Sequence, residues 1–220
     1  MIILTGCGKA PGRIVGGEEA AKNSIRWQVG LVFRGNSSQF CGGTLIGPRH
    51  VLTAAHCYNG IINFDITVGD HDKYNADGEV THKVCRVASH PKYDEETHPR
   101  YDYDFAVVTL KEPVAFNSKV APACLADNSM IGDKLVGKKA VVSGWGKLSE
   151  NGASAAKLHK VEVPVMTNKK CLSDYANTYY DITSSMICAG QSKGQIDSCE
   201  GDSGGIQCWH SILIWKYICF

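Results

Sequence analysis

Short apolar runs separated by turn-forming residues make up most of the chain from Trp27 onward. The runs are rich in Val, Ile, Leu, Phe and Thr, the breaks contain Gly, Asn and Pro, and no helical period persists for more than a few turns. Runs of this composition and length predict β-strands. The expected strands cover residues 27–33, 40–46, 50–55, 62–68, 83–89, 105–110, 139–145 and 157–165. Many short strands indicate an antiparallel all-β fold, either a sandwich or a barrel.

The chain length sets the domain organisation that we expect. A chain of 220 residues is long enough for one large all-β unit or for two small domains. The segment Ala121 to Val136 is the expected crossover between two halves. We therefore expect an N-terminal unit at 14–120 and a C-terminal unit at 121–220, preceded by a lead peptide at 1–13 that ends at the basic residue Arg13.

Charge and cysteine content narrow the function classes. There are 23 Lys and Arg residues against 22 Asp and Glu, and the net charge of +1 does not favour binding to nucleic acid or to an anionic membrane. Ten cysteines without a CxxC pair or an HExxH motif favour disulfides over a zinc site, and therefore an extracellular, secreted protein. The opening MIILTGCGKA has too short an apolar run for a signal peptide, so we expect either that the signal lies outside this chain or that the N-terminus is incomplete. No apolar run has membrane-spanning length.

Asp197 to Gly205, DSCEGDSGG, is the stretch in which the sequence most clearly indicates catalysis. Ser203 has small neighbours that let a carbonyl approach, and the backbone N–H groups of Gly201 and Ser203 could hold an oxyanion. A serine hydroxyl becomes a good nucleophile only when a base takes its proton. GDSGG also fits the GxSxG elbow of α/β-hydrolases, in which the acid and the histidine follow the serine. Only 17 residues follow Ser203 and none is Asp or Glu, so the order here must be His, Asp, Ser.

His56 is the candidate base. It ends an apolar strand beside small alanines in TAAHC, and a disulfide between Cys41 and Cys57 would clamp the turn that presents it. The alternative is that any histidine here is a surface residue or a satisfied core residue. We expect that of the other seven, which are His50, His71, His82, His90, His98, His159 and His210.

Asp104 is the candidate acid. It directly precedes the apolar run FAVV, where a carboxylate is expensive to bury unless a group such as an imidazole donates to it. Asp102 lies two residues earlier, on the side that we expect to be more solvated. The alternative interpretation of either residue is a capping or turn aspartate.

The lead GKAPGRIVGG suggests a cleavage site. A flexible polar segment is where proteolysis concentrates, and cleavage after Arg13 would make Ile14 a new α-amino terminus. A plain linker is the alternative.

Five motifs, RIVGG, TAAHC, DFAVV, SGWG and DSCEGDSGG, occur in the order and at the separations typical of trypsin-like serine proteases of the chymotrypsin family, which the chain resembles from Arg13 to about Gly205. The resemblance implies a zymogen with two antiparallel Greek-key β-barrels, at 14–120 and 121–220, and an active site between them. His56 would be general base and then general acid, Asp104 would orient the imidazole, and Ser203 would attack the scissile carbonyl.

The resemblance also assigns roles around this triad. Gly201 and Ser203 would supply the oxyanion hole, and Ile14, freed by cleavage after Arg13, would pair with Asp202. Asp197 matches the carboxylate that selects Arg or Lys in the substrate, where a buried cation needs a counter-charge. The expected partners are protein or peptide substrates, an activating protease, and inhibitors of the serpin or Kunitz type.

The cysteines are sorted by the same resemblance. It implies the pairs Cys41 with Cys57, Cys171 with Cys188, and Cys7 with Cys124, the last tethering the lead peptide after cleavage. Four cysteines have no assigned partner, namely Cys85, Cys199, Cys208 and Cys219.

Two further signals are weaker. Asn36 begins the sequon NSS, which would be glycosylated in a secreted chain. The loop from Asp70 to Glu79 resembles in position the calcium loop of some relatives, but it misses the EF-hand pattern. We expect no cofactor or catalytic metal, and an acidic turn with calcium as the alternative.

After Gly205 the sequence IQCWHSILIWKYICF departs from the family pattern. The resemblance implies a proline, an SWG-like segment, a second pocket wall and a terminal helix, and none of these can be matched. We therefore expect a second barrel that is truncated after about residue 205. Two functions follow: an endopeptidase cutting after Arg or Lys, or a catalytically impaired homologue or truncated isoform that acts as a binding protein.

Overall fold

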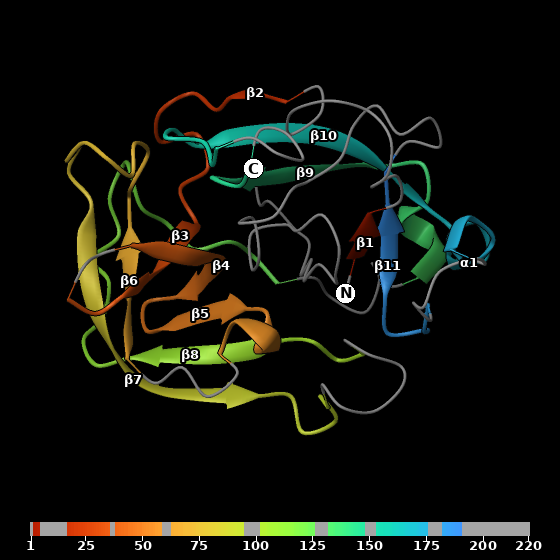
Figure 1. Ribbon diagram of the computed structural model, residues 1–220, viewed down its shortest axis with the longest axis horizontal. Helices are drawn as coiled ribbons and strands as arrows, with labels where there is room; N and C mark the ends of the chain where they lie inside the picture. The colour runs from red at the N-terminus through yellow and green to blue at the C-terminus, as the bar shows by residue number, and fades with distance from the viewer. Residues whose placement is uncertain are drawn as a thin grey trace.

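Six strands of the N-terminal half close into a barrel (Figure 1). The computed structural model describes residues 2–4, 17–35, 38–58, 63–94, 102–125, 132–147, 153–175 and 182–190. The barrel follows the order β3-β4-β5-β8-β7-β6, each neighbouring pair is antiparallel, and β6 pairs back onto β3 to close it. The strands are β3 (Gln28–Phe33), β4 (Gln39–Gly47), β5 (His50–Thr53), β6 (Phe64–Val68), β7 (Val80–Ser89) and β8 (Ala106–Leu110).

The barrel interior is filled mainly by branched aliphatic side chains, together with Phe64 and the smaller Cys41, Ala54 and Cys57. Strand β8 alternates buried and half-buried positions, as the two-residue period of a strand with one core face requires. Gly43 allows β4 to approach this core closely, because a Cβ at that position would lie 2.9 Å from a Val51 methyl carbon. The largest buried members are Leu31, Leu45, Phe64, Ile66 and Leu110.

The C-terminal half contains a five-stranded sheet built around β10 (His159–Met166). β10 pairs with three strands, all antiparallel: β9 (Lys139–Gly144), β11 (Ile187–Ala189) and the two-residue β2 (Glu18–Glu19). The far edge of β11 pairs in parallel with β1 (Ile2–Leu4).

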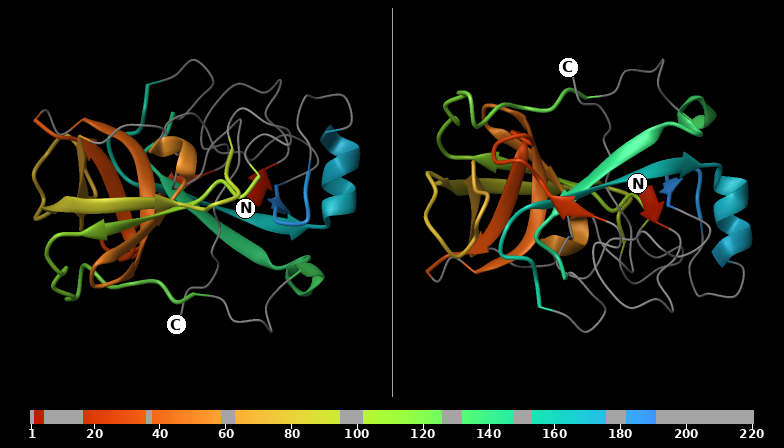
Figure 2. Two further views of the ribbon diagram at one scale, coloured as in Figure 1. Left: turned by 90° about the horizontal axis from the view of Figure 1, so that it is seen from below. Right: turned by 90° about the horizontal axis from the view of Figure 1, so that it is seen from above.

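One short helix completes the description of this half. Helix α1 (Asn168–Tyr175) follows β10 and lies at the end of the molecule opposite the barrel (Figure 2). A 3-10 helix at Gly132–Leu135 precedes β9. No helix in the described part of the chain is long and apolar enough to span a membrane.

The two halves are joined by specific contacts. Trp145, which follows β9, is almost fully buried and donates from Nε1 to the backbone oxygen of His71 at 3.0 Å. Ser143 on β9 donates to the side-chain oxygen of Gln28 on β3 at 2.7 Å. These hydrogen bonds satisfy buried polar groups and so fix the position of β9 against the barrel.

The predicted fold class is confirmed. All eight predicted strands are present, and the described residues form a closed barrel plus a second sheet, consistent with a chymotrypsin-like double barrel. The sequence pattern did not predict β1, β2, β11 or α1.

Arg34 stabilises the barrel wall through an ion pair with Asp65, and removing Arg34 should destabilise the protein. Its guanidinium binds both carboxylate oxygens of Asp65 on β6, with the shortest contact 2.7 Å, and this hydrogen bonding lowers the pKa of the buried Asp65 carboxyl. Arg34→Ala leaves that carboxylate poorly compensated, so at pH 7 the free energy of unfolding in urea should fall. The lowered pKa means that the contribution is present above about pH 4 and is lost as the pH falls through the folded-state pKa.

Lys139→Ala is the matched control, because Lys139 and Glu162 form an ion pair on an exposed face. A pair that is exposed to solvent contributes little to stability, so its loss should change the free energy of unfolding much less than Arg34→Ala does. An equal fall in the free energy of unfolding for Arg34→Ala and Lys139→Ala would contradict a stabilising role for the Arg34–Asp65 ion pair.

Candidate active site

His56 lies in a single 3-10 turn, Ala55–Cys57, directly after β5. The preceding alanines, Ala54 and Ala55, are buried, so the turn packs tightly against the barrel. A disulfide between Cys57 and Cys41 ties this turn to β4, with the two Cα atoms 6.2 Å apart. The position of the imidazole is therefore fixed from both sides.

The His56 and Asp104 side chains face each other across this turn. Nδ1 of His56 lies 2.7 Å from Oδ2 of Asp104, and the backbone N–H of His56 donates to Oδ1 at 2.9 Å. The carboxylate has no exposed surface, and the imidazole is 15% exposed. A carboxylate at this depth is stable only when donors reach its oxygens, and His56 supplies a donor to each one.

This geometry selects one imidazole tautomer. An ionised carboxylate only accepts hydrogen bonds, so Nδ1 of His56 carries the proton that it shares with Asp104. Nε2 then holds the lone pair. The pair can therefore take a proton at Nε2 and stabilise the imidazolium that results.

Asp102 does not behave as a plain solvated aspartate. It is half-buried, and its Oδ1 accepts hydrogen bonds from the hydroxyl groups of Thr183 and Ser185 in the C-terminal half. Local sequence reasoning missed both hydroxyl residues, because nothing near Asp102 in the sequence points to partners so far along the chain.

The sulfur atoms beside His56 do not form a metal site. Cys41, His56 and Cys57 are the one group of three in the described residues whose ligand atoms lie within 4.8 Å of one another. Both cysteines are joined in a disulfide and are not available as thiolates.

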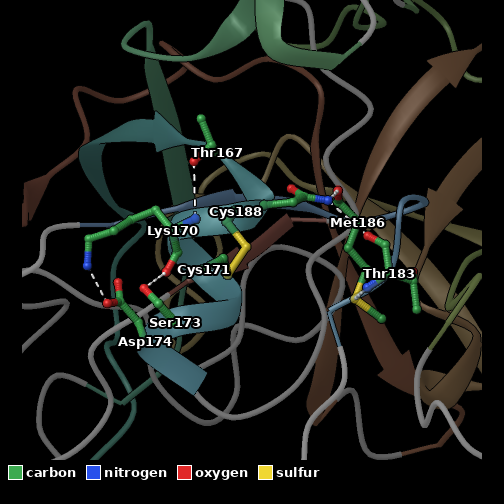
Figure 3. The surroundings of a disulfide bond; sticks show 9 residues. Thr167, Lys170, Cys171, Ser173, Asp174, Thr183, Met186 and Cys188 are labelled. Atoms are coloured by element: carbon green, nitrogen blue, oxygen red, sulfur yellow. Dashed lines mark hydrogen bonds and ion pairs between the residues drawn. A yellow bond between two sulfur atoms is a disulfide. The ribbon is translucent and has the colours of Figure 1, made fainter. Parts of the chain in front are cut away.

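Two of the implied disulfides are present. Cys41 pairs with Cys57, and Cys171 pairs with Cys188, which joins α1 to β11 (Figure 3). Cys124 is also in a disulfide, and its partner lies outside the described residues, as does Cys7. Cys85 on β7 is an exposed free cysteine.

The acidic loop after β6 holds a carboxyl group in an unfavourable environment. Burial raises the pKa of Asp70 to about 6, and the nearby charges of Glu79, Asp77 and Asp72 add to this effect. The buried Oδ1 atoms of Asp70 and Asp77 accept no hydrogen bond within the described residues. Oxygen ligands of this kind suit calcium, yet the loop does not bring three carboxylate ligand atoms within 4.8 Å of one another among those residues.

Asp70→Asn should stabilise the protein in EDTA at alkaline pH. A raised pKa means that the folded state binds the proton more tightly than the unfolded state, so ionisation of the carboxyl begins to cost stability above about pH 4 and costs it in full above about pH 6. We expect the variant to gain about 1–3 kcal/mol at pH 8, an advantage that shrinks as the pH falls and disappears below about pH 4.

The measurement is urea unfolding of wild type and variant across this range. Asp174→Asn, an aspartate on α1, is the control. A stability difference between wild type and Asp70→Asn that does not change with pH would show that the raised pKa of Asp70 is not its cause.

Several predicted site residues lie outside the described parts of the chain. They are Arg13, Ile14, Asn36, Asp197, Gly201, Asp202 and Ser203. Of the predicted triad, the structure therefore places His56 and Asp104 together, and the role of Ser203 stays a prediction.

Comparison with known proteins identifies the family. The family model Trypsin matches residues 14–211. Coagulation factor IX of Cavia porcellus is 35% identical over 194 residues, which is 88% of this chain and 66% of that protein, just under two thirds of its length. Trypsin 5G1 of Aedes aegypti is 38% identical over 216 residues, covering 96% of this chain and 78% of that protein. With a family match over most of its length and two such relatives, this chain belongs to the trypsin-like serine proteases of the chymotrypsin family.

Proposed function

We propose that this chain is a serine endopeptidase that uses His56, Asp104 and Ser203. The observation that carries the proposal is the buried contact of 2.7 Å between Nδ1 of His56 and Oδ2 of Asp104. A histidine held in one tautomer by a buried carboxylate is the arrangement that a serine nucleophile requires.

The reaction proceeds through an acyl-enzyme. Nε2 of His56 takes the hydroxyl proton as Ser203 Oγ bonds to the scissile carbonyl carbon, and the backbone N–H groups of Gly201 and Ser203 hold the oxyanion. The imidazolium then gives that proton to the leaving amine as the C–N bond breaks. Water, deprotonated by the same nitrogen, attacks the ester carbonyl carbon. The C–O bond to Ser203 then breaks, Nε2 returns the proton to Ser203 Oγ, and the acyl group leaves as a carboxylic acid.

Asp197 sets the specificity in this proposal. A carboxylate at the base of the pocket compensates the charge of an Arg or Lys side chain that has lost its water. The substrates are therefore proteins or peptides cut after Arg or Lys.

Cleavage after Arg13 activates the enzyme in this proposal, and Arg13→Gln should abolish the activity. The uncut chain has no Ile14 α-amino group to pair with Asp202, so the oxyanion hole is not formed. An activating protease with specificity for Arg or Lys should cut wild type and leave the variant intact on a reducing gel. Full hydrolysis of an arginyl ester by the uncut variant would remove the zymogen proposal.

The remaining proposals concern metal, inhibitors and location. Catalysis needs no metal, and calcium, if it binds, acts through the acidic loop from Asp70 to Glu79 on stability alone. The inhibitors belong to the serpin or Kunitz type. The protein is secreted, which the disulfides support, because such bonds persist in oxidising compartments.

A second candidate function is that of a catalytically impaired homologue, and it follows from the last residues of the sequence, which lie beyond the family match at 14–211. If those residues leave the substrate pocket incomplete, the protein would bind partners of the active enzyme without turning over substrate. Substrate positioning contributes about 7–11 kcal/mol to catalysis, so loss of a pocket wall alone would make the enzyme slow.

A fluorophosphonate probe separates these two functions. The probe asks only for an activated serine and an oxyanion hole. Covalent labelling of the Arg13-cleaved chain that is absent in Ser203→Ala supports the endopeptidase. A folded, protease-resistant chain that takes no label would favour the binding protein.

A further inference from the structure

At a tight turn, residues 102–105, the carboxylates of Asp102 and Asp104 bind different partners. Residues two apart in an extended strand project to the same side. Here Asp104 binds His56 in the barrel, and Asp102 binds Thr183 and Ser185 in the other half of the molecule. The residue between them, Tyr103, has φ +53°, in the left-handed region that a non-glycine residue rarely adopts.

This left-handed conformation is supported from the barrel side. The Tyr103 ring stacks on His90 with ring centres 4.7 Å apart, and Lys92 Nζ lies 5.1 Å from the centre of the same ring. The backbone N–H of Phe105 donates to the Tyr103 oxygen at 2.7 Å. A conformation of this kind persists only where its surroundings hold it.

Asp102 holds the turn from the other side. Its Oδ1 accepts from Thr183 Oγ1 at 2.8 Å, from the Ser185 hydroxyl, and from the Tyr103 backbone N–H at 3.0 Å. All three donors converge on one oxygen atom.

The two hydroxyl groups come from a turn that is itself braced. Nδ2 of Asn168, at the start of α1, donates to the backbone oxygens of both Thr183 and Met186 at 2.9 Å. The Cys171–Cys188 disulfide lies beside this turn and joins α1 to β11 (Figure 3). Thr183 and Ser185 therefore project from a rigid support.

We propose that Asp102 is a positioning residue, and that its hydrogen bonds to Thr183 and Ser185 hold Asp104 against His56. These hydrogen bonds from Thr183 and Ser185 to Asp102, which we call the clamp, join the C-terminal half of the molecule to the N-terminal half. The acid of the predicted triad, Asp104, lies in the N-terminal half. The effect of the clamp on rate rests on the proposed function, whereas its effect on the His56 and Asp104 hydrogen bond does not.

The chemistry makes the proposal specific. The donors converge on Oδ1, so an uncharged amide oxygen at that position accepts the same three hydrogen bonds. Asp102→Asn should therefore keep the clamp, and Asp102→Ala should lose it. If Asp102 acted instead through its negative charge on the imidazolium, the two variants would be equally impaired.

The first measurement is the low-field proton NMR resonance of Nδ1–H between His56 and Asp104, taken on the full chain without inhibitor. We expect it in wild type and in Asp102→Asn, and we expect it to be lost or broadened in Asp102→Ala. This result does not require the protein to turn over substrate. Failure to label with fluorophosphonate would thus count against the proposed function and not against the clamp.

The second measurement is the rate of an arginyl substrate. Small displacements of a catalytic group can cost about 100-fold. We expect kcat to fall about 10- to 100-fold in Asp102→Ala with KM within about twofold, and to stay within about threefold of wild type in Asp102→Asn. Glu162→Gln, which removes a carboxylate from an exposed ion pair, is the control and should match wild type.

Ser185→Ala with Thr183→Val tests the clamp from its other side, in case Asp102→Ala does not fold. This pair of changes should reproduce the loss of the resonance, and adding Asp102→Asn to it should cost nothing more. Retention of the resonance in a folded Asp102→Ala, equal loss in the Asn and Ala variants, or no such resonance in wild type would each overturn the proposal.

Discussion

Replacing His56 with alanine should lower kcat by roughly 10⁶-fold, because without an acceptor at Nε2 the Ser203 hydroxyl keeps its proton. The barrel should survive the change, since the neighbouring disulfide remains and the backbone N–H of residue 56 still donates to Oδ1 of Asp104. The measurement is steady-state hydrolysis of an arginyl ester by the Arg13-cleaved protein.

His50→Ala is the matched control for this variant. His50 begins β5, the strand that leads to His56, and its side chain is exposed. We expect normal kcat and KM for it. Residual activity in His56→Ala within about tenfold of wild type would show that another group is the base, or that the measured activity comes from a contaminant.

Asp104→Asn should lower kcat by about 10⁴-fold while leaving KM close to wild type. The amide that replaces Oδ2 can present its NH₂ group to Nδ1 of His56, and the imidazole then has to accept there. Accepting at Nδ1 puts the proton on Nε2, which is the wrong tautomer for taking a proton from Ser203. The shape of the site is nearly unchanged, so the loss is chemical.

Asp174→Asn, on the far helix α1, controls for the removal of an aspartate charge and should retain full activity. Thermal melting of Asp104→Asn close to that of wild type would separate the loss of tautomer from a loss of fold. An equal fall in kcat for both aspartate variants would contradict the role of Asp104.

The strands could be predicted from sequence where the hydrophobic pattern is long enough to carry a period. β3, β8 and β10 have five to eight residues, with alternating burial in β8 and β10 and a continuous buried run in β3, and each was found close to its predicted bounds. The elements that were missed are short or depend on distant partners. β2 is two exposed glutamates whose strand character comes only from pairing with β10, and β11 is three residues long.

The candidate site also has residues that could be predicted from the local sequence and residues that could not. His56 and Asp104 could be predicted because each sits beside an apolar strand in which an unpaired polar group would be costly. The part played by Asp102 could not, because its environment is made by Thr183 and Ser185, which the fold brings in from the opposite half. A carboxylate that faces solvent and one that receives two hydroxyl groups look the same in the local sequence.

The parallel pairing of β1 with β11 has a consequence for how the chain folds. Ile2 lies opposite Ile187, so nearly the whole of the described chain separates these two partners. Contacts of such long sequence separation form slowly, because the intervening chain must lose conformational entropy before the hydrogen bonds between the strands can offset that loss. During synthesis β1 is made early, and it can pair only after β11, almost the last described element, has been made. Until they meet, the outer edge of β11 offers unpaired backbone groups to any neighbouring chain. Refolding yield should therefore fall as protein concentration rises, with β1 docking as the late step.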